Sequence, residues 1–375
     1  MTNFTRRDFF KTLAAATAGL ALAENGFGFA AAKHLSEPFE FLVVGDSIIW
    51  GQGLEEKDKF YTYTAEWLRE GAFGGPRHVS LKVKAHSGST LKFHPDEAEK
   101  YKKAGRDESY YYKPEVNVGF PSIWKQIETG ADEYKVSGVT RGADLIMLTG
   151  GITDITVSKV LDPFDDKSKL TPLIEKYLLH DMHDVIDHAA KLHPNALIAV
   201  VGYFPMLSPQ TRNARLMNNW LESMSFPRIL KPFANNPVTR QLFFNRLKKK
   251  GIERSRIWFD QSNRCMLAAI ARLNVAHGKQ RAVFVPTPIT EDTCLETPDT
   301  LLFRMGKNGV TDDPLYRSRT ADCDIALPEL KRNTDIKYPV RLCEIAAVGH
   351  PNAAGSRAYA EAIKTALLPS IRQKT

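Results

Sequence analysis

The stretch FEFLVVGDSIIWGQGL, residues 39–54, indicates the fold of the chain. Its first seven residues are mostly apolar, as in a strand that is buried on both faces of a parallel sheet. Gly45, Asp46 and Ser47 follow at once, and these residue types are common where a strand gives way to a turn. Ligand sites in open parallel sheets lie at the carboxyl ends of the strands. We therefore expect a first strand over 39–45 that presents the Ser47 hydroxyl at such an edge.

Further apolar runs alternate with amphipathic stretches along the chain. Strands are predicted over 79–85, 143–150, 196–204 and 281–285. Helices are predicted over 57–70, 121–128, 171–194, 262–275 and 352–369. A surface insertion is expected over 92–118, short helical pieces over 205–260 and a long loop over 286–345. This alternation predicts the α/β class, with one flavodoxin-like three-layer αβα domain, a five-stranded parallel sheet, and loop and helical insertions.

Residues 1–32 have the features of an export signal. Arg6 and Arg7 precede Asp8, Phe9, Phe10 and Lys11, and the apolar run LAAATAGLALA and small residues come next. This order predicts a twin-arginine signal peptide over 1–32 and a mature domain over 33–375. We expect the twin-arginine translocase to be a partner during export, and a periplasmic or secreted location.

Composition and charge narrow the function classes. The chain has 375 residues, of which 43% are hydrophobic, as in a globular protein. Outside the N-terminus no apolar run reaches about 18 residues, so no internal membrane span is expected. The formal net charge of +8 favours anionic surroundings such as an envelope surface. Lys248-Lys249-Lys250 is interpreted as a solvated helix end, and no nucleic-acid partner is expected.

The chain contains four cysteines, Cys265, Cys294, Cys323 and Cys343. An even number in an exported protein permits two disulfides, with three possible pairings, and free buried thiols are the alternative. A zinc site is disfavoured because no pair has the usual spacing of about two to four residues. We expect disulfides and no metal.

Three more segments carry candidate chemistry at predicted strand ends or before the last helix. Gly88 lies in AHSGST (85–90), Thr153 in LTGGITDI (148–155) and His350 in AAVGHPNAAGSRAYAEAI (346–363). Each segment alone is typical of an ordinary turn. Together with Ser47 they supply a nucleophile, a base and candidate oxyanion donors, which is what acyl transfer by a serine requires.

The four segments resemble the sequence blocks of the SGNH/GDSL hydrolase family, in the same chain order. The resemblance implies a serine esterase or acylhydrolase that cleaves an ester of a small molecule or polymer, without a metal or organic cofactor. It implies that Ser47 is the nucleophile and that His350 is the general base. Ser47 and Gly88 would donate backbone N–H groups to the oxyanion, and Thr153 stands where the family has an asparagine donor.

Two departures from the family pattern define an alternative. A threonine hydroxyl at position 153 reaches less far than an amide. Ala347 occupies the place of the aspartate that orients the histidine, so the orienting group is a carboxylate from elsewhere, such as Glu344, Asp322 or Asp324, or a backbone carbonyl. A serine–histidine dyad is our working hypothesis. The alternative is a catalytically weak or inactive envelope protein of the same fold that binds a glycan or lipid.

Two other patterns have an ordinary and a functional interpretation. HDMHDVIDH (180–188) places three histidines and several aspartates on one helix, either as a metal site or, as we favour, as its polar face. Aromatic residues could form a carbohydrate or lipid platform, or be core and surface residues. These residues are Trp50, Tyr61, Tyr110, Tyr111 and Tyr112.

Overall fold

The computed structural model describes residues 37–212, 237–306 and 309–372. The predicted signal peptide, residues 1–32, lies outside the described residues. Residues Pro38–Thr375 form one compact unit.

The central sheet confirms the predicted fold class. Its strands are β1 (Phe39–Gly45), β2 (Val79–Val83), β3 (Leu145–Thr149), β4 (Leu197–Val201) and β5 (Ala282–Val285). All neighbours pair in parallel in the order β2-β1-β3-β4-β5, which is the flavodoxin-like order. Every residue of β1, β3 and β4 is buried, which explains why their sequences are mostly apolar.

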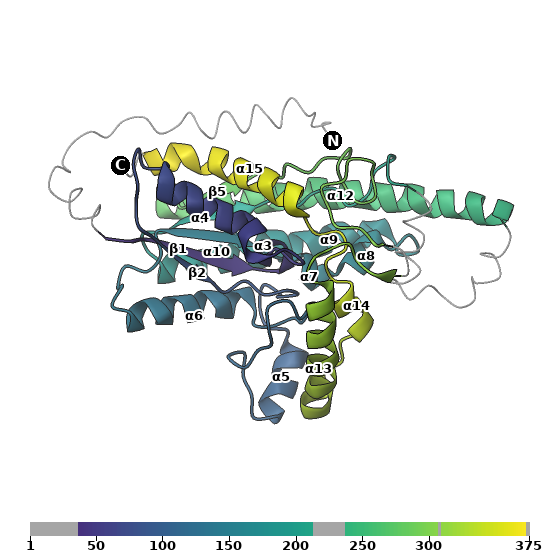
Figure 1. The fold of residues 1–375 in the computed structure, drawn as a ribbon, viewed down its shortest axis with the longest axis horizontal. Coiled ribbons are helices and arrows are strands. Elements are labelled where there is room, and N and C mark those ends of the chain that lie inside the picture. The colour runs from purple at the N-terminus through teal and green to yellow at the C-terminus, as the bar shows by residue number, and fades with distance from the viewer. Residues whose placement is uncertain (1–36, 213–236, 307–308, 373–375) are drawn as a thin grey trace. The chain divides into compact units, whose positions relative to one another are not determined.

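Helices cover both faces of the sheet (Figure 1). On one face α4 (Phe60–Glu70) packs against α15 (Ala353–Arg372), whereas α10 (Met182–Leu192) packs between α6 (Ile123–Val136) and α12 (Pro237–His277) on the other. Two of these helices are longer than predicted. The helix α12 extends well before residue 262, and α15 continues through Pro369. The helix predicted from Thr171 begins at Leu170 as α9 (Leu170–Ile174), and a π-helical segment (Glu175–Asp181) joins it to α10.

The prediction of a loop over 286–345 is wrong in its second half. This region contains α13 (Tyr316–Thr334) and α14 (Val340–Glu344). Pro328 lies inside α13, and the helix is strongly polar, so its sequence lacks a clear apolar stripe. Its buried side chains lie along most of the helix, but they include the polar Arg319 and Thr334.

The stretch 92–118 is more than a surface insertion. It contains α5 (Pro95–Lys103), and its buried residues pack against α13 to form a second hydrophobic cluster. The buried members are Tyr101, Val116, Val118, Phe120, Cys323, Ala326, Leu327, Leu330, Ile336 and Cys343. This satellite cluster is separate from the main core around the sheet.

One disulfide, between Cys323 and Cys343, ties α13 to α14. Cys265 and Cys294 are free and buried, so the expectation of two disulfides is half correct. Among the described residues, no helix combines the length and apolar character that crossing a membrane requires.

Candidate active site

Ser47 begins a short helix at the carboxyl end of β1. Gly45 ends the strand with φ at +148°, and a Cβ there would lie 2.7 Å from the carbonyl oxygen of Thr149. Asp46 then caps the helix α3 (Ser47–Trp50), because its Oδ1 accepts the N–H of Ile48 at 2.9 Å. A residue with a Cβ at position 45 would clash with the backbone of β3, so this turn requires glycine. The sequence thus places the Ser47 hydroxyl at the sheet edge.

The structure brings Ser47 and His350 together. The Nε2 atom of His350 lies 2.7 Å from the Oγ of Ser47, although the two residues are 303 positions apart. His350 sits just before α15, and its carbonyl accepts the N–H of Phe303 at 2.8 Å. The N–H of Gly349 in turn donates to the carbonyl of Phe303 at 3.0 Å. These backbone bonds fix the loop that carries the imidazole.

The imidazole of His350 is held in its neutral form. Burial, and then the positive charge of Arg319, lower its pKa to about 4, while the carbonyl groups of Ala347, Ala346 and Val348 act in the opposite direction. Within the described part of the chain, its Nδ1 has no hydrogen bond of good geometry. A neutral imidazole is the form that accepts a proton from serine.

The suggested carboxylates do not reach the imidazole. Glu344 pairs with Arg341 at 2.9 Å, and Asp322 pairs with Lys113 at 2.8 Å. Asp324 is exposed on α13. The carbonyls of Ala347, Ala346 and Val348 are the described groups that raise the pKa of the imidazole.

Gly88 lies in the turn after β2. Its φ is +82°, and a Cβ would lie 2.6 Å from the carbonyl oxygen of Val118, so this position requires glycine. Gln126 of α6 ties the turn to β1, since its Oε1 accepts the N–H of Gly45 at 2.7 Å and its Nε2 donates to Ser89 Oγ at 2.8 Å. Across the described ranges, the N–H groups of Ser47 and Gly88 have no hydrogen-bond partner.

Thr153 lies in the short helix α7 (Ile152–Ile155) that follows β3, with its hydroxyl turned to the Gly88 turn. The hydroxyl donates to the carbonyl of Ser89. A hydroxyl has one hydrogen to donate, so this bond must open before Thr153 can serve an oxyanion. The next residue, Asp154, accepts the N–H of Leu91 at 3.1 Å, and burial raises its pKa to about 7.

A buried tyrosine connects the nucleophile turn to β3 and was missed in the sequence. Tyr203, just after β4, donates its hydroxyl to Asp46 Oδ2 at 2.9 Å and accepts the N–H of Ile152 at 3.1 Å. Burial raises the pKa of Asp46 to about 7. Tyr203 lies near the carboxyl end of the strand predicted over 196–204, which is the signal that could have identified it. Gln126 carries no comparable signal, because it lies inside a helix.

The other sequence candidates have structural partners. His188 stacks on Trp124, Asp184 pairs with Lys92, and Asp187 pairs with Lys191. Among the described residues, no three His, Cys, Asp or Glu side chains are placed to hold a metal ion.

The five aromatic candidates do not form one platform. Tyr61 is buried, the Trp50 indole donates to Glu115 at 2.8 Å, and Tyr112 donates to Glu329. Tyr110 and Tyr111 are exposed.

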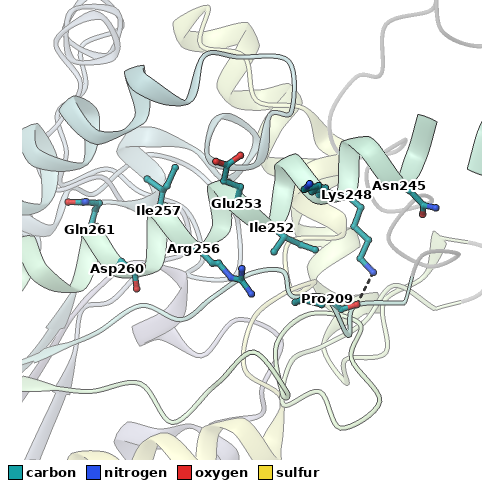
Figure 2. Close-up of a pocket in the computed structure, with 10 residues that line it drawn as sticks. Pro209, Asn245, Lys248, Ile252, Glu253, Arg256, Ile257, Asp260 and Gln261 are labelled. Atoms are coloured by element: carbon teal, nitrogen blue, oxygen red, sulfur yellow. Dashed lines mark hydrogen bonds between the residues drawn. The ribbon is translucent and has the colours of Figure 1, made fainter. Parts of the chain in front are cut away.

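A cavity of about 880 Å³ lies along α12 and includes neither Ser47 nor His350 (Figure 2). Lys248, Ile252, Arg256 and Pro209 are among its lining residues. Lys248 reaches across it to the carbonyl of Pro209 at 3.1 Å. It contains none of the residues predicted from the sequence to act in catalysis.

Fold and site together define an α/β protein with a serine–histidine pair at the carboxyl edge of its sheet. No family model and no curated protein matches the chain. Among solved structures, an extracellular lipase from Streptomyces rimosus is similar at a TM-score of 0.42 and 13% identity, covering 87% of this chain and 99% of the lipase. A phospholipase A1 from Streptomyces albidoflavus is similar at a TM-score of 0.39 and 12% identity, covering 90% of this chain and 100% of its own. A carbohydrate esterase of family 2 from Corynascus thermopiles (Myceliophthora fergusii) is similar at a TM-score of 0.38 and 15% identity, covering 89% of this chain and 66% of its own.

Proposed function

We propose that this protein is a serine esterase or acylhydrolase with Ser47 as nucleophile and His350 as general base. The observation that carries the proposal is the 2.7 Å contact between His350 Nε2 and Ser47 Oγ. A serine hydroxyl is a weak nucleophile until an adjacent base accepts its proton, and this contact supplies the base.

The proposed reaction uses only protein groups and water. Ser47 Oγ attacks the ester carbonyl while His350 Nε2 takes its proton, and the oxyanion is held by the N–H groups of Ser47 and Gly88. Thr153 is the proposed third donor, after its bond to Ser89 opens. The imidazolium then protonates the leaving alcohol as the bond between carbonyl carbon and alcohol oxygen breaks. Water attacks the acyl-serine by the same route, releases the acid and restores the Ser47 hydroxyl.

The proposed orienting group for His350 is main chain rather than carboxylate. The carbonyls of Ala346, Ala347 and Val348 are the groups that favour a charged imidazole. A carbonyl that accepts the Nδ1 proton keeps Nε2 free to act as base. The protein would therefore work as a dyad.

The test is replacement of each member of the dyad. We expect Ser47→Ala and His350→Ala to lower hydrolysis of p-nitrophenyl acetate by about a thousandfold or more, while circular dichroism shows an intact fold. Ser137→Ala and His94→Ala, at the ends of α6 and α5, are the matched controls and should keep full activity. A Ser47→Ala variant that hydrolyses the ester at the wild-type rate would exclude the proposal.

A non-catalytic envelope protein that binds a glycan or lipid is the second candidate. The observations that favour it are Ala347 in the acid position and, among the described residues, the lack of a hydrogen bond from a carboxylate to His350. A fluorophosphonate probe separates the two, because it bonds covalently to an activated serine. A wild-type protein whose Ser47 stays unlabelled would support the binding role.

We also propose a periplasmic or secreted location, reached through the twin-arginine translocase. The signal over residues 1–32 and the Cys323–Cys343 disulfide support it, since disulfides persist in oxidising compartments. The positive net charge would favour contact with anionic envelope components.

A further inference from the structure

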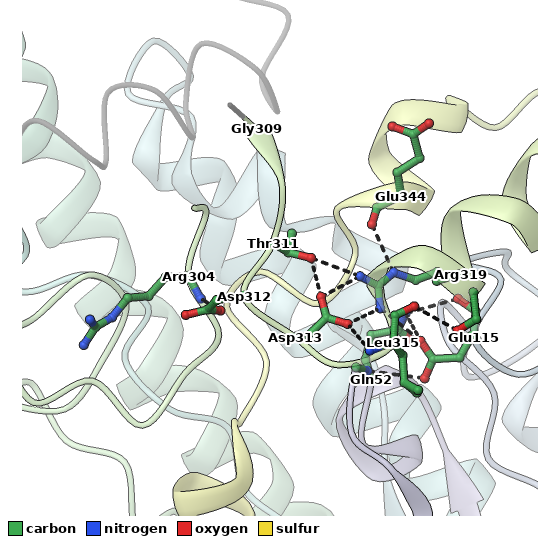
Figure 3. A network of polar contacts seen from close by, with 12 residues as sticks. Gln52, Glu115, Arg304, Gly309, Thr311, Asp312, Asp313, Leu315, Arg319 and Glu344 are labelled. Carbon is green, nitrogen blue, oxygen red and sulfur yellow. Dashed lines mark hydrogen bonds and ion pairs between the residues drawn. The ribbon is translucent and has the colours of Figure 1, made fainter. Parts of the chain in front are cut away.

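A buried ion cluster is centred on Arg319 of α13 (Figure 3). The side chains of Arg319 and Asp313 are fully buried, and their two hydrogen bonds measure 2.9 and 2.7 Å. Arg319 Nη1 also donates to Glu115 Oε2 at 3.2 Å. Burying such charges is costly, and well-packed apolar side chains often give equal or greater stability. Stability alone therefore does not account for the cluster.

One side of the cluster holds the segment that follows the nucleophile. The carboxylate of Glu115 accepts hydrogen bonds from Trp50 Nε1 at 2.8 Å, Gln52 Nε2 at 3.0 Å and the N–H of Gly53 at 3.3 Å. These residues continue the turn that Ser47 begins. Through Glu115, Arg319 is thus connected to the nucleophile loop, residues 50–53.

The other side holds the segment that leads to the base. Arg319 Nε donates to the carbonyl of Glu344 at 3.0 Å, where α14 ends and the His350 loop starts. A Cβ on Gly53 would lie 2.7 Å from the Cβ of Ala347 and 3.0 Å from that of Asp313. The nucleophile loop therefore packs directly on Ala347, three residues before His350.

On the basis of the esterase function proposed above, we propose that Arg319 is a positioning residue that holds the nucleophile loop against the His350 loop. Its planar guanidinium bonds at once to Glu115, Asp313 and the Glu344 carbonyl, a geometry that a lysine does not reproduce. Arg319 acts through these loops and does not touch the reacting atoms.

The charge of Arg319 gives a readout that a purely structural role would not change. Burial has the largest effect in lowering the pKa of His350, and the positive charge of Arg319 has the next largest. Asp313 and Glu115 surround Arg319, and Lys59 at the start of α4 faces Glu115. Removing the guanidinium leaves the two carboxylates without their partner, which raises the pKa of His350.

The experiment compares Arg319→Lys, which keeps the charge, with Arg319→Met, which removes it. The rate constant for fluorophosphonate labelling of Ser47 is measured per mole of folded protein between about pH 4 and 9. We expect both variants to react about tenfold to a hundredfold more slowly. Only Arg319→Met should shift the acid limb of the profile to higher pH. Arg317→Lys and Arg317→Met, at an exposed arginine of the same helix, should match the wild type.

Glu115→Gln provides a second variant if Arg319→Met does not fold. It weakens the bond between the cluster and the nucleophile loop, and we expect slower labelling. Labelling at the wild-type rate in both Arg319→Lys and Glu115→Gln would overturn the positioning role alone. A wild-type protein that does not label at Ser47 would reject the esterase proposal, and this one with it.

Discussion

At the residue scale, the unusual feature of the site is a catalytic-type histidine whose charged neighbour is an arginine. In a serine–histidine–aspartate triad the acid stabilises the imidazolium that forms during the reaction. In this chain position 347 is alanine, and burial, followed by the charge of Arg319, lowers the pKa of His350. In the proposed reaction the neutral base would be available over a wider pH range, at the expense of a less stable imidazolium.

This environment predicts the pH dependence of the dyad. A reaction that needs neutral imidazole is lost as the pH falls through the pKa of the free enzyme, which is about 4 for His350. We expect the rate of Ser47 labelling to stay nearly constant from about pH 8 to 6 and to decline only near pH 4. An acid limb centred near the ordinary histidine value of 6.5 would contradict this expectation.

A melting curve at each pH is the control. The folded pKa of His350 lies below its ordinary value, so its contribution to stability is present above about pH 6.5 and is lost as the pH falls toward 4. The contribution of Asp46 to stability changes with pH in the opposite direction, because its folded pKa of about 7 lies above its ordinary value of 3.8. Its contribution is present below 3.8 and is lost as the pH rises through 7.

Replacement of Thr153 tests whether its hydroxyl positions the Gly88 turn or binds the oxyanion. Because the hydroxyl donates to Ser89, we expect Thr153→Ala to slow ester hydrolysis about tenfold, the value of one ordinary hydrogen bond. Thr153→Ser keeps the hydroxyl and should retain most activity. A loss of about 10²–10³ in kcat would instead indicate a direct oxyanion donor.

At the element scale, α13 and α14 form a unit that the sequence pattern did not reveal. Helix prediction relies on an apolar stripe, and the buried side chains of α13 include Arg319 and Thr334. The ion cluster escaped prediction for a related reason. Its members come from segments interpreted as loop or insertion, and Arg319 and Glu115 are 204 positions apart.

The disulfide between these helices should contribute measurably to stability. It closes a segment of 20 residues, for which the loss of chain entropy in the unfolded state is worth about 3 kcal/mol. We expect reduction, or the double variant Cys323→Ser/Cys343→Ser, to lower the free energy of unfolding in urea by about that amount.

The double variant is its own control, since a reductant should not change its unfolding curve further. Cys265 and Cys294 are already free thiols and give no additional response. A wild-type protein that becomes fully reduced without any shift in its urea midpoint would disprove the contribution.

At the scale of the whole molecule, the sheet was predictable because each strand is specified by a short segment of neighbouring residues. Four of the strands are short, mostly apolar runs and β2 alternates between apolar and polar residues. Their parallel pairing follows from the alternation with helices. Ser47 could be placed at the sheet edge because it follows a strand end. His350 precedes a helix, and its approach to Ser47 was expected only from the four segments taken together. The group that would orient His350 could not be chosen from the sequence, because it depends on the path of a loop rather than on a residue type.

The separation of Ser47 and His350 along the chain has a consequence for biosynthesis. On the proposed function, the nucleophile Ser47 would leave the ribosome with the first strand, whereas its base, His350, would emerge only after β5 and α14 have been made. A nascent or prematurely terminated polypeptide would therefore contain Ser47 without His350. Hydrolytic power would arise in a single late event, when translation passes residue 350 and the final helix docks.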